Sequence, residues 1–181
     1  AAVIAFVLTT FIIANSEVPS GSMENTIMTG SRVIGSRLNY LFTDPERGDV
    51  VIFVFGWECP ACGNTIEGEK QEICPYCESD VGKRGKTIYY VKRIIGLPGE
   101  TVQIDLEGNI YINGEILEED YGLETIQNPG RAAEPITLGE DEYFVLGDNR
   151  NNSQDSRFAS VGNVHRSDII GRAWLRIWPL D

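Results

Sequence analysis

Short apolar runs rich in β-branched and aromatic residues alternate with turns containing glycine or proline over most of the chain. Continuous runs of this kind are typical of buried strands, and no segment after residue 15 has a helical period of useful length. The pair Asn113-Gly114 adds a tight turn. The expected strands cover residues 50–55, 87–95, 101–105, 109–112, 142–146 and 169–178. The pattern therefore predicts a mainly β fold built on an antiparallel sheet.

The N-terminal residues 1–13 form an uncharged apolar run. A membrane-spanning helix needs about 20 apolar residues, so we interpret this run as the outer end of a longer transmembrane anchor. The first basic residue is Arg32, and the lack of positive charge beside the run favours an extracytoplasmic flank. Three other interpretations stay open: a buried core segment, an edge strand begun by the β-branched residues at the end of the run, and a secretory signal.

All four cysteines fall in one polar segment, residues 57–83, between the first two expected strands. They form two Cys-x-x-Cys pairs, Cys59 with Cys62 and Cys74 with Cys77. This spacing is typical of a structural zinc site with four thiolates. The segment has few apolar residues, so the metal would supply much of its folding energy. Two disulfides or a redox-active pair are the alternatives.

Length and charge limit the function classes that the chain can serve. A chain of 181 residues suits one domain with a small insertion. The formal net charge of −12 argues against a nucleic-acid partner, which requires clustered lysine and arginine. It also argues against adsorption to anionic lipid by charge, so contact with a lipid bilayer would have to be apolar. The predicted organisation is an anchor end at 1–13, a core at 14–56 and 84–181, and a zinc-ribbon-like insertion at 57–83.

Ser22, in the segment 19–24 (PSGSME), is a candidate nucleophile, and Ser20 lies on the same side of an extended backbone. Lys92 is the candidate base because it lies in the middle of an apolar strand, on the face that carries Tyr90 and Ile94. Apolar surroundings lower the pKa of a lysine from about 10.4, and a neutral amine can accept a serine proton.

Each of these residues also has a simpler interpretation. A Ser-Gly-Ser sequence is often only a loop, and a strand lysine is often an edge residue with a solvated amine. His165 is the one histidine of the chain and an alternative base. Residues 147–157 (GDNRNNSQDSR) form either a solvated loop or a hydrogen-bond network that fixes a nearby site.

Four blocks of the sequence together resemble the bacterial type I signal peptidase family. They occur in the family's order and, with the closing residues of the chain, the resemblance covers nearly all of it outside the cysteine segment. The blocks are residues 19–24, 47–51 (RGDVV), 90–100 (YVKRIIGLPGE) and 147–157. The lysine and loop blocks are highly specific, whereas the serine block is weaker alone.

The resemblance implies a Ser/Lys dyad in which Ser22 attacks the scissile carbonyl and Lys92 is the general base, with no cofactor for catalysis. It implies that Ser20 donates to the oxyanion and that Ser153 orients the lysine, while Met23 helps to line the site. Further support residues are Asp148, Asp155, Arg93 and Arg157. A carboxylate paired directly with Lys92 would raise its pKa, so we expect both aspartates to pair with arginines.

The implied function is that of a membrane-anchored serine endopeptidase on the outer face of the bacterial cell membrane. It would remove signal peptides from secretory precursors with small residues at positions −1 and −3, bound as an extended strand on an exposed sheet edge. The chain departs from the family at Asn25 and His165, where proline is common, and in its cysteine insertion, which could dock a protein partner. Self-cleaving repressors share the Ser-Lys arrangement. A non-catalytic membrane-associated protein that recruits partners through the zinc ribbon is the main alternative.

Overall fold

The computed structural model describes residues 13–17, 20–24, 26–36, 39–68, 71–82, 85–122 and 124–178. The predicted anchor lies outside these residues except for Ile13, as does Asn25. Within the described ranges, no helix has the length and apolar character needed to cross a membrane.

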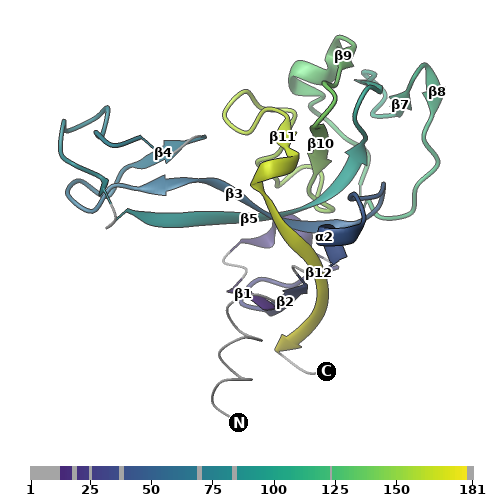
Figure 1. The fold of residues 1–181 in the computed structure, drawn as a ribbon. Coiled ribbons are helices and arrows are strands. Elements are labelled where there is room, and N and C mark those ends of the chain that lie inside the picture. Colours follow the sequence, from purple (N-terminus) through teal and green to yellow (C-terminus); the bar gives the residue numbers. More distant parts are fainter. Residues whose placement is uncertain are drawn as a thin grey trace.

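Two antiparallel sheets make up the described part of the chain (Figure 1). The larger sheet has eight strands in the order β1-β2-β12-β3-β5-β10-β11, with β4 beside β3. Its strands are β1 (Ile13–Glu17), β2 (Arg32–Ser36), β3 (Val50–Glu58), β4 (Thr65–Glu67), β5 (Lys86–Gly96), β10 (Glu142–Leu146), β11 (Val164–His165) and β12 (Ile169–Trp178). The smaller sheet, in the order β8-β7-β6-β9, contains β6 (Thr101–Ile104), β7 (Ile110–Ile112), β8 (Glu115–Ile116) and β9 (Ile136–Thr137). The short helical turns are η2 (Gly21–Met23), α2 (Asn39–Phe42), η4 (Gly130–Ala133) and η5 (Arg166–Asp168).

The mainly β fold predicted from the hydrophobic pattern is confirmed. Asn113 and Gly114 have φ values of 53° and 84° and join β7 to β8, as the tight-turn signal predicted. At the N-terminal end, the last residue of the apolar run begins β1, which pairs with β2 at the edge of the larger sheet. The edge-strand interpretation therefore holds for the described end of that run.

Strand β10 is buried on both faces, which explains why its sequence is continuously apolar. Tyr143 and Val145 belong to one hydrophobic cluster, whereas Phe144 and Leu146 belong to another on the opposite face. All four side chains are at most 2% exposed. Full burial of one such side chain stabilises the fold by about 1.5–3 kcal/mol, so these two cores fix the position of the adjoining strand β5.

Strands β3 and β5 continue from the core into the cysteine segment as one ladder. Their pairing runs from Val50 opposite Arg93 to Glu58 opposite Lys86, and β4 joins the other edge of β3 at its outer end. Figure 1 shows these three strands as an arm that reaches away from the smaller sheet. The predicted insertion at 57–83 thus starts inside a core strand, because Trp57 and Glu58 still pair with β5.

Candidate active site

The turn η2 presents Ser22 at the surface of the larger sheet. Met23 is fully buried in a cluster that contains Ile52 of β3 and Val91 of β5. The expectation that Met23 lines the site is therefore wrong: its side chain packs into the core, which anchors the turn and leaves the neighbouring Ser22 facing the other way. The buried Met23 side chain contributes about 1.5–3 kcal/mol to this anchoring.

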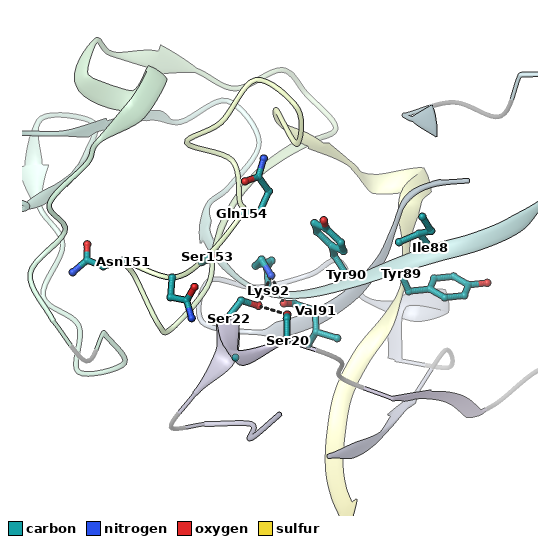
Figure 2. Close-up of a pocket in the computed structure, with 12 residues that line it drawn as sticks. Ser20, Ser22, Ile88, Tyr89, Tyr90, Val91, Lys92, Asn151, Ser153 and Gln154 are labelled. Atoms are coloured by element: carbon teal, nitrogen blue, oxygen red, sulfur yellow. Dashed lines mark hydrogen bonds between the residues drawn. The ribbon is translucent and has the colours of Figure 1, made fainter. Parts of the chain in front are cut away.

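Lys92 of β5 meets Ser22 across a sequence separation of 70 residues. Its Nζ donates to Ser22 Oγ at 2.7 Å and to the carbonyl of Val91 at 3.1 Å. The two side chains point toward one another in Figure 2. Lys92 is 3% exposed and Ser22 is 6% exposed, so the hydrogen bond is shielded from bulk water.

Burial lowers the pKa of Lys92 from 10.5 to about 8, although the negative charges of Asp155 and Asp148 act in the opposite direction. Desolvation outweighs attraction because neither carboxylate is a hydrogen-bond partner of the amine. A base with a pKa near the working pH is neutral in a substantial fraction of molecules. Lys92 can therefore accept the proton of Ser22 without a histidine.

Tyr90 forms the apolar side of the lysine environment, as strand alternation predicted. The ring centroid of Tyr90 lies 5.0 Å from Lys92 Nζ, and the ring stacks on Phe55 at 4.0 Å. The attraction between a cation and this ring favours the protonated amine, but it is weaker than the loss of hydration on burial. The stacked pair fixes the wall beside the amine.

Both aspartates of the loop pair with arginines, as predicted. Asp148 accepts two hydrogen bonds from Arg93, at 2.8 and 2.7 Å, and Asp155 accepts two from Arg157, at 2.8 and 2.9 Å. All four side chains are buried. Each arginine neutralises its carboxylate in a bidentate pair, so the carboxylates raise the pKa of Lys92 less than free carboxylates would.

Asn149 is a contact residue that the sequence analysis did not single out. Its side-chain Nδ2 donates to the carbonyl of Gly21 at 3.0 Å, and its backbone N–H donates to the carbonyl of Ser22 at 3.1 Å. The polar loop thus holds the serine turn through its backbone carbonyls. The density of asparagines in residues 147–157 was the available signal, but it did not indicate which one reaches the turn.

Ser20 and Ser153 both line the pocket that contains Ser22 and Lys92. Ser20 Oγ donates to Ser22 Oγ at 3.4 Å, a long hydrogen bond. Ser153 Oγ is buried and has no hydrogen-bond partner among the described residues, so the expected bond to Lys92 is not formed. In this structure the amine is oriented by Ser22 and the carbonyl of Val91 instead.

The pocket has a volume of about 530 Å³ and opens beside the Ser22 hydroxyl. Its walls come from the serine turn, from β5 and from the polar loop (Figure 2). The lining residues are Ser20, Gly21, Ser22, Ile88, Tyr89, Tyr90, Val91, Lys92, Asn151, Asn152, Ser153 and Gln154. His165 lies outside this lining, is half exposed and faces Asp141 at 3.5 Å, so it is not placed to act on Ser22.

Comparisons with known proteins show the family of this chain. Residues 1–178 match the family described as signal peptidase, peptidase S26. This chain belongs to the signal peptidase family. It is 35% identical to a probable signal peptidase I-2 from Synechocystis sp. over 99% of this chain and 70% of that protein. It is 38% identical to a signal peptidase I from Leptolyngbya laminosa over 99% of this chain and 75% of that protein. It is 30% identical to signal peptidase I P from Bacillus subtilis subsp. natto over all of this chain and 85% of that protein.

Gly147 is a second position at which the polar loop of this signal peptidase family member packs closely against the serine turn. A Cβ at this position would lie 2.2 Å from Ser153 Oγ and 2.5 Å from the backbone carbonyl of Ser22. Both distances are far below contact, and the carbonyl belongs to backbone that cannot rotate away. A side chain here must therefore displace the turn that carries Ser22.

We expect the variant Gly147→Ala to fold but to lose about 10²-fold in kcat, because a displacement of about 1 Å is enough to misalign a reacting pair. The measurement is kcat on a peptide substrate, with circular dichroism as the check on folding. Gly139→Ala is a matched control, since a Cβ there would meet only the flexible side chain of Glu142, at 3.3 Å or more. An unchanged kcat in Gly147→Ala would show that the close packing of Gly147 against the serine turn does not control the position of Ser22.

The four cysteines of the insertion converge at the outer end of the arm. Their sulfur atoms all lie within 4.8 Å of one another, and the Cys59–Cys77 and Cys62–Cys74 Sγ distances are both 3.7 Å. None of the four forms a disulfide. The separation is far longer than the disulfide bond length of about 2.05 Å. It matches the edge of about 3.8 Å of a tetrahedron whose corners lie about 2.3 Å from a central zinc ion.

The backbone around the sulfur atoms also suits a cation. The N–H groups of Cys62 and Ala61 lower the pKa of Cys59, and hydrogen bonds from Ser79 lower the pKa of Cys77 to about 6. The N–H of Asn64 lowers the pKa of Cys62, but burial and the neighbouring thiols raise it to about 12. Four crowded sulfurs therefore ionise together only beside a cation, and the residues present could hold a metal ion.

Proposed function

We propose that this chain is a serine endopeptidase that removes signal peptides from precursor proteins, with Ser22 as the nucleophile and Lys92 as the general base. The observation that carries the proposal is the buried 2.7 Å hydrogen bond between Lys92 Nζ and Ser22 Oγ beside an open pocket. The membership of the signal peptidase family and the names of the relatives support the same substrate class.

The proposed reaction begins with the neutral amine of Lys92, which accepts the proton of Ser22 as Oγ attacks the scissile carbonyl. The resulting ammonium returns the proton to the leaving amine, and the acyl group stays on Ser22. Lys92 then accepts a proton from a water molecule that attacks the ester, and it returns this proton to Ser22 Oγ as the acyl–oxygen bond breaks. Ser20 Oγ and the backbone N–H of Ser22 are the proposed donors to the oxyanion. Arg93 and Arg157 support the site through their pairs with Asp148 and Asp155.

We further propose that the enzyme acts on the extracytoplasmic face of a bacterial membrane, with residues 1–13 at the outer end of its anchor. The apolar part of a signal peptide lies in or near the bilayer, so an anchored enzyme would meet the cleavage site at the membrane surface. Preference for small residues at −1 and −3 belongs to the same proposal.

A cleavage assay with the Ser22→Ala variant tests the proposed function. The substrate is a precursor peptide whose signal ends in Ala-x-Ala, and the products are measured by mass spectrometry. We expect the wild type to cut after the second Ala and Ser22→Ala to lose at least about 10³-fold in kcat. The variant Ser167→Ala serves as a control, because Ser167 is exposed and lies outside the pocket. No cleavage by folded wild-type protein would favour the alternative of a non-catalytic membrane-associated binding protein.

The pH dependence of cleavage should follow the protonation state of Lys92. The pKa of Lys92 is lowered to about 8 by burial, and only its neutral form is a base. The neutral fraction rises about tenfold between pH 6 and 7 and about fivefold between pH 7 and 8, so kcat/KM should rise in the same way and level off above about pH 8. A profile that is flat over this range, or that keeps rising to pH 10.5, would argue against a buried lysine as the base.

We also propose that the four cysteines hold one structural zinc ion. Four thiolates leave no open position for a substrate, so the metal would stabilise the arm and take no part in the reaction. The insertion has only a small apolar cluster, in which Ile66 and Val81 are the members besides cysteines. The folding energy of this segment would come mainly from the metal.

A further inference from the structure

Strand β5 has an unpaired edge that starts at the active site. From Lys86 to Lys92 one edge of β5 pairs with β3, while β10 pairs with the other edge only from Arg93 to Gly96. No strand in the described part of the chain occupies the remaining edge. Its length is about 20 Å at about 3.3 Å per residue. Natural proteins usually cover or shorten such an edge, because it readily accepts another strand.

This edge is continuous with the pocket around Ser22. Ile88, Tyr89 and Tyr90 line the pocket and lie on β5 between the lysine and the outer end of the arm, as Figure 2 shows. Tyr89 is 41% exposed, which is unusual for a tyrosine in the middle of a sheet. An extended chain with its scissile bond at Ser22 could therefore continue along β5 without leaving the surface.

The cysteine insertion closes the outer end of the ladder that carries this edge. Glu58, which precedes Cys59, pairs with Lys86, and β4 pairs with the same part of β3 from its other side. The sulfur cluster thus closes the end of a three-stranded arm. Without it, the outer ends of β3 and β5 would form an isolated two-stranded ribbon, which is marginally stable in water.

We infer that the arm formed by β3, β4 and β5, closed by the four cysteines, lengthens the substrate-binding edge. The enzyme would then bind an extended precursor segment that reaches beyond the residues next to the cut. The occupant is the substrate polypeptide itself, added as a further strand along Lys86–Lys92. The inference rests on the proposed function for the identity of the ligand. A metal ion held by the four cysteines would stabilise the outer end of this edge and would take no part in the chemistry.

Binding of uncleaved peptides to Ser22→Ala, measured by calorimetry, tests the inference. Three peptides share the residues around the cut: a short one and two that extend it by about six residues before or after the cut. We expect an extension on one side to lower Kd at least about tenfold, and N-methylation at alternate residues of that extension to remove the gain. Equal Kd for all three peptides, or a gain that survives methylation, would overturn the inference.

Two further binding measurements distinguish a contribution of the β5 edge from a contribution of other parts of the arm. Tyr89→Ala, added to Ser22→Ala, should remove the gain of the long peptide, while Tyr76→Ala should keep it, since Tyr76 is exposed on the second Cys-x-x-Cys turn outside the pocket. Metal removal should also remove the gain but leave the binding of the short peptide unchanged within about twofold. A gain that persists in the metal-free protein would contradict the role of the cysteines.

These results are distinct from a failure of the proposed function. If wild-type enzyme does not cut the short peptide, the peptidase proposal fails whatever the edge binds. If it cuts the short and long peptides with the same kcat/KM, and the long peptide binds no tighter, the peptidase proposal stands and the extended edge does not.

Discussion

Replacement of Lys92 by methionine should abolish peptide cleavage and at the same time stabilise the protein. Methionine has a similar length and apolar character, so the site should keep its shape. The loss of the base should lower kcat by about 10³-fold or more. A residue that is costly to the fold but kept for its chemistry is expected to show this combination of effects.

The gain in stability follows from the linkage between pKa and folding. The pKa of Lys92 is about 8 in the folded protein and 10.5 when the side chain is solvated, so the unfolded state binds the proton more tightly. Stability therefore rises as the pH increases from about 8 to 10.5, and the full penalty applies below pH 8. A shift of this size corresponds to a penalty on the order of 3 kcal/mol at pH 7, which Lys92→Met removes.

Thermal unfolding at pH 7 and at pH 10.5 measures this effect. We expect the melting temperature of Lys92→Met to exceed that of the wild type by roughly 5–10 °C at pH 7, and the difference to shrink toward zero at pH 10.5. Lys86→Met is the matched control, since Lys86 lies on the same strand but is exposed; it should change neither kcat on a short peptide nor stability. A destabilised Lys92→Met with wild-type kcat would refute the role of Lys92 on both counts.

Removal of the metal should unfold the insertion while the core stays folded. Structural zinc contributes about 10–16 kcal/mol in zinc-finger peptides, far more than the small cluster of Cys59, Ile66, Cys74 and Val81 can supply. We therefore expect a chelator, or the variant Cys74→Ser, to remove hydrogen-exchange protection from residues 59–81. Protection in β10 should persist, because its contacts come from the two main cores.

Metal content and a thiol count complete this experiment. The untreated protein should contain about one zinc ion per chain and lose it on chelation. Ile73→Ala is a control in the same segment, since Ile73 is 54% exposed and should not affect metal binding. An arm that survives chelation but opens under a reducing agent would show that disulfides, and not zinc, hold the segment together.

The sequence determined the features that depend on neighbouring residues. Continuous apolar runs at 50–55 and 87–95 became β3 and β5, because short runs rich in β-branched and aromatic residues favour strands. Asn113-Gly114 produced its turn because both residues tolerate positive φ. The two Cys-x-x-Cys pairs already specified a four-sulfur cluster, since each pair turns two thiols to the same side.

The sequence also singled out Ser22 and Lys92, but only the tertiary structure could bring them together. Alternation along β5 placed Lys92 on the face of Tyr90, yet it did not reveal whether that face was dry. The pKa near 8 results from burial by distant elements, and the 2.7 Å contact requires the η2 turn to be anchored by Met23 and held by Asn149.

The same reason explains what the sequence did not predict. Met23 was expected in the pocket but lies in the core. Ser153 was expected to form a hydrogen bond with Lys92 but does not. The edge of β5 is open because its pairing with β10 ends at Arg93. Local patterns fix how a segment prefers to fold and which side chains share a face. Desolvation, hydrogen-bond partners and unpaired edges are set by which distant segments pack against that face, so only the assembled structure decides them.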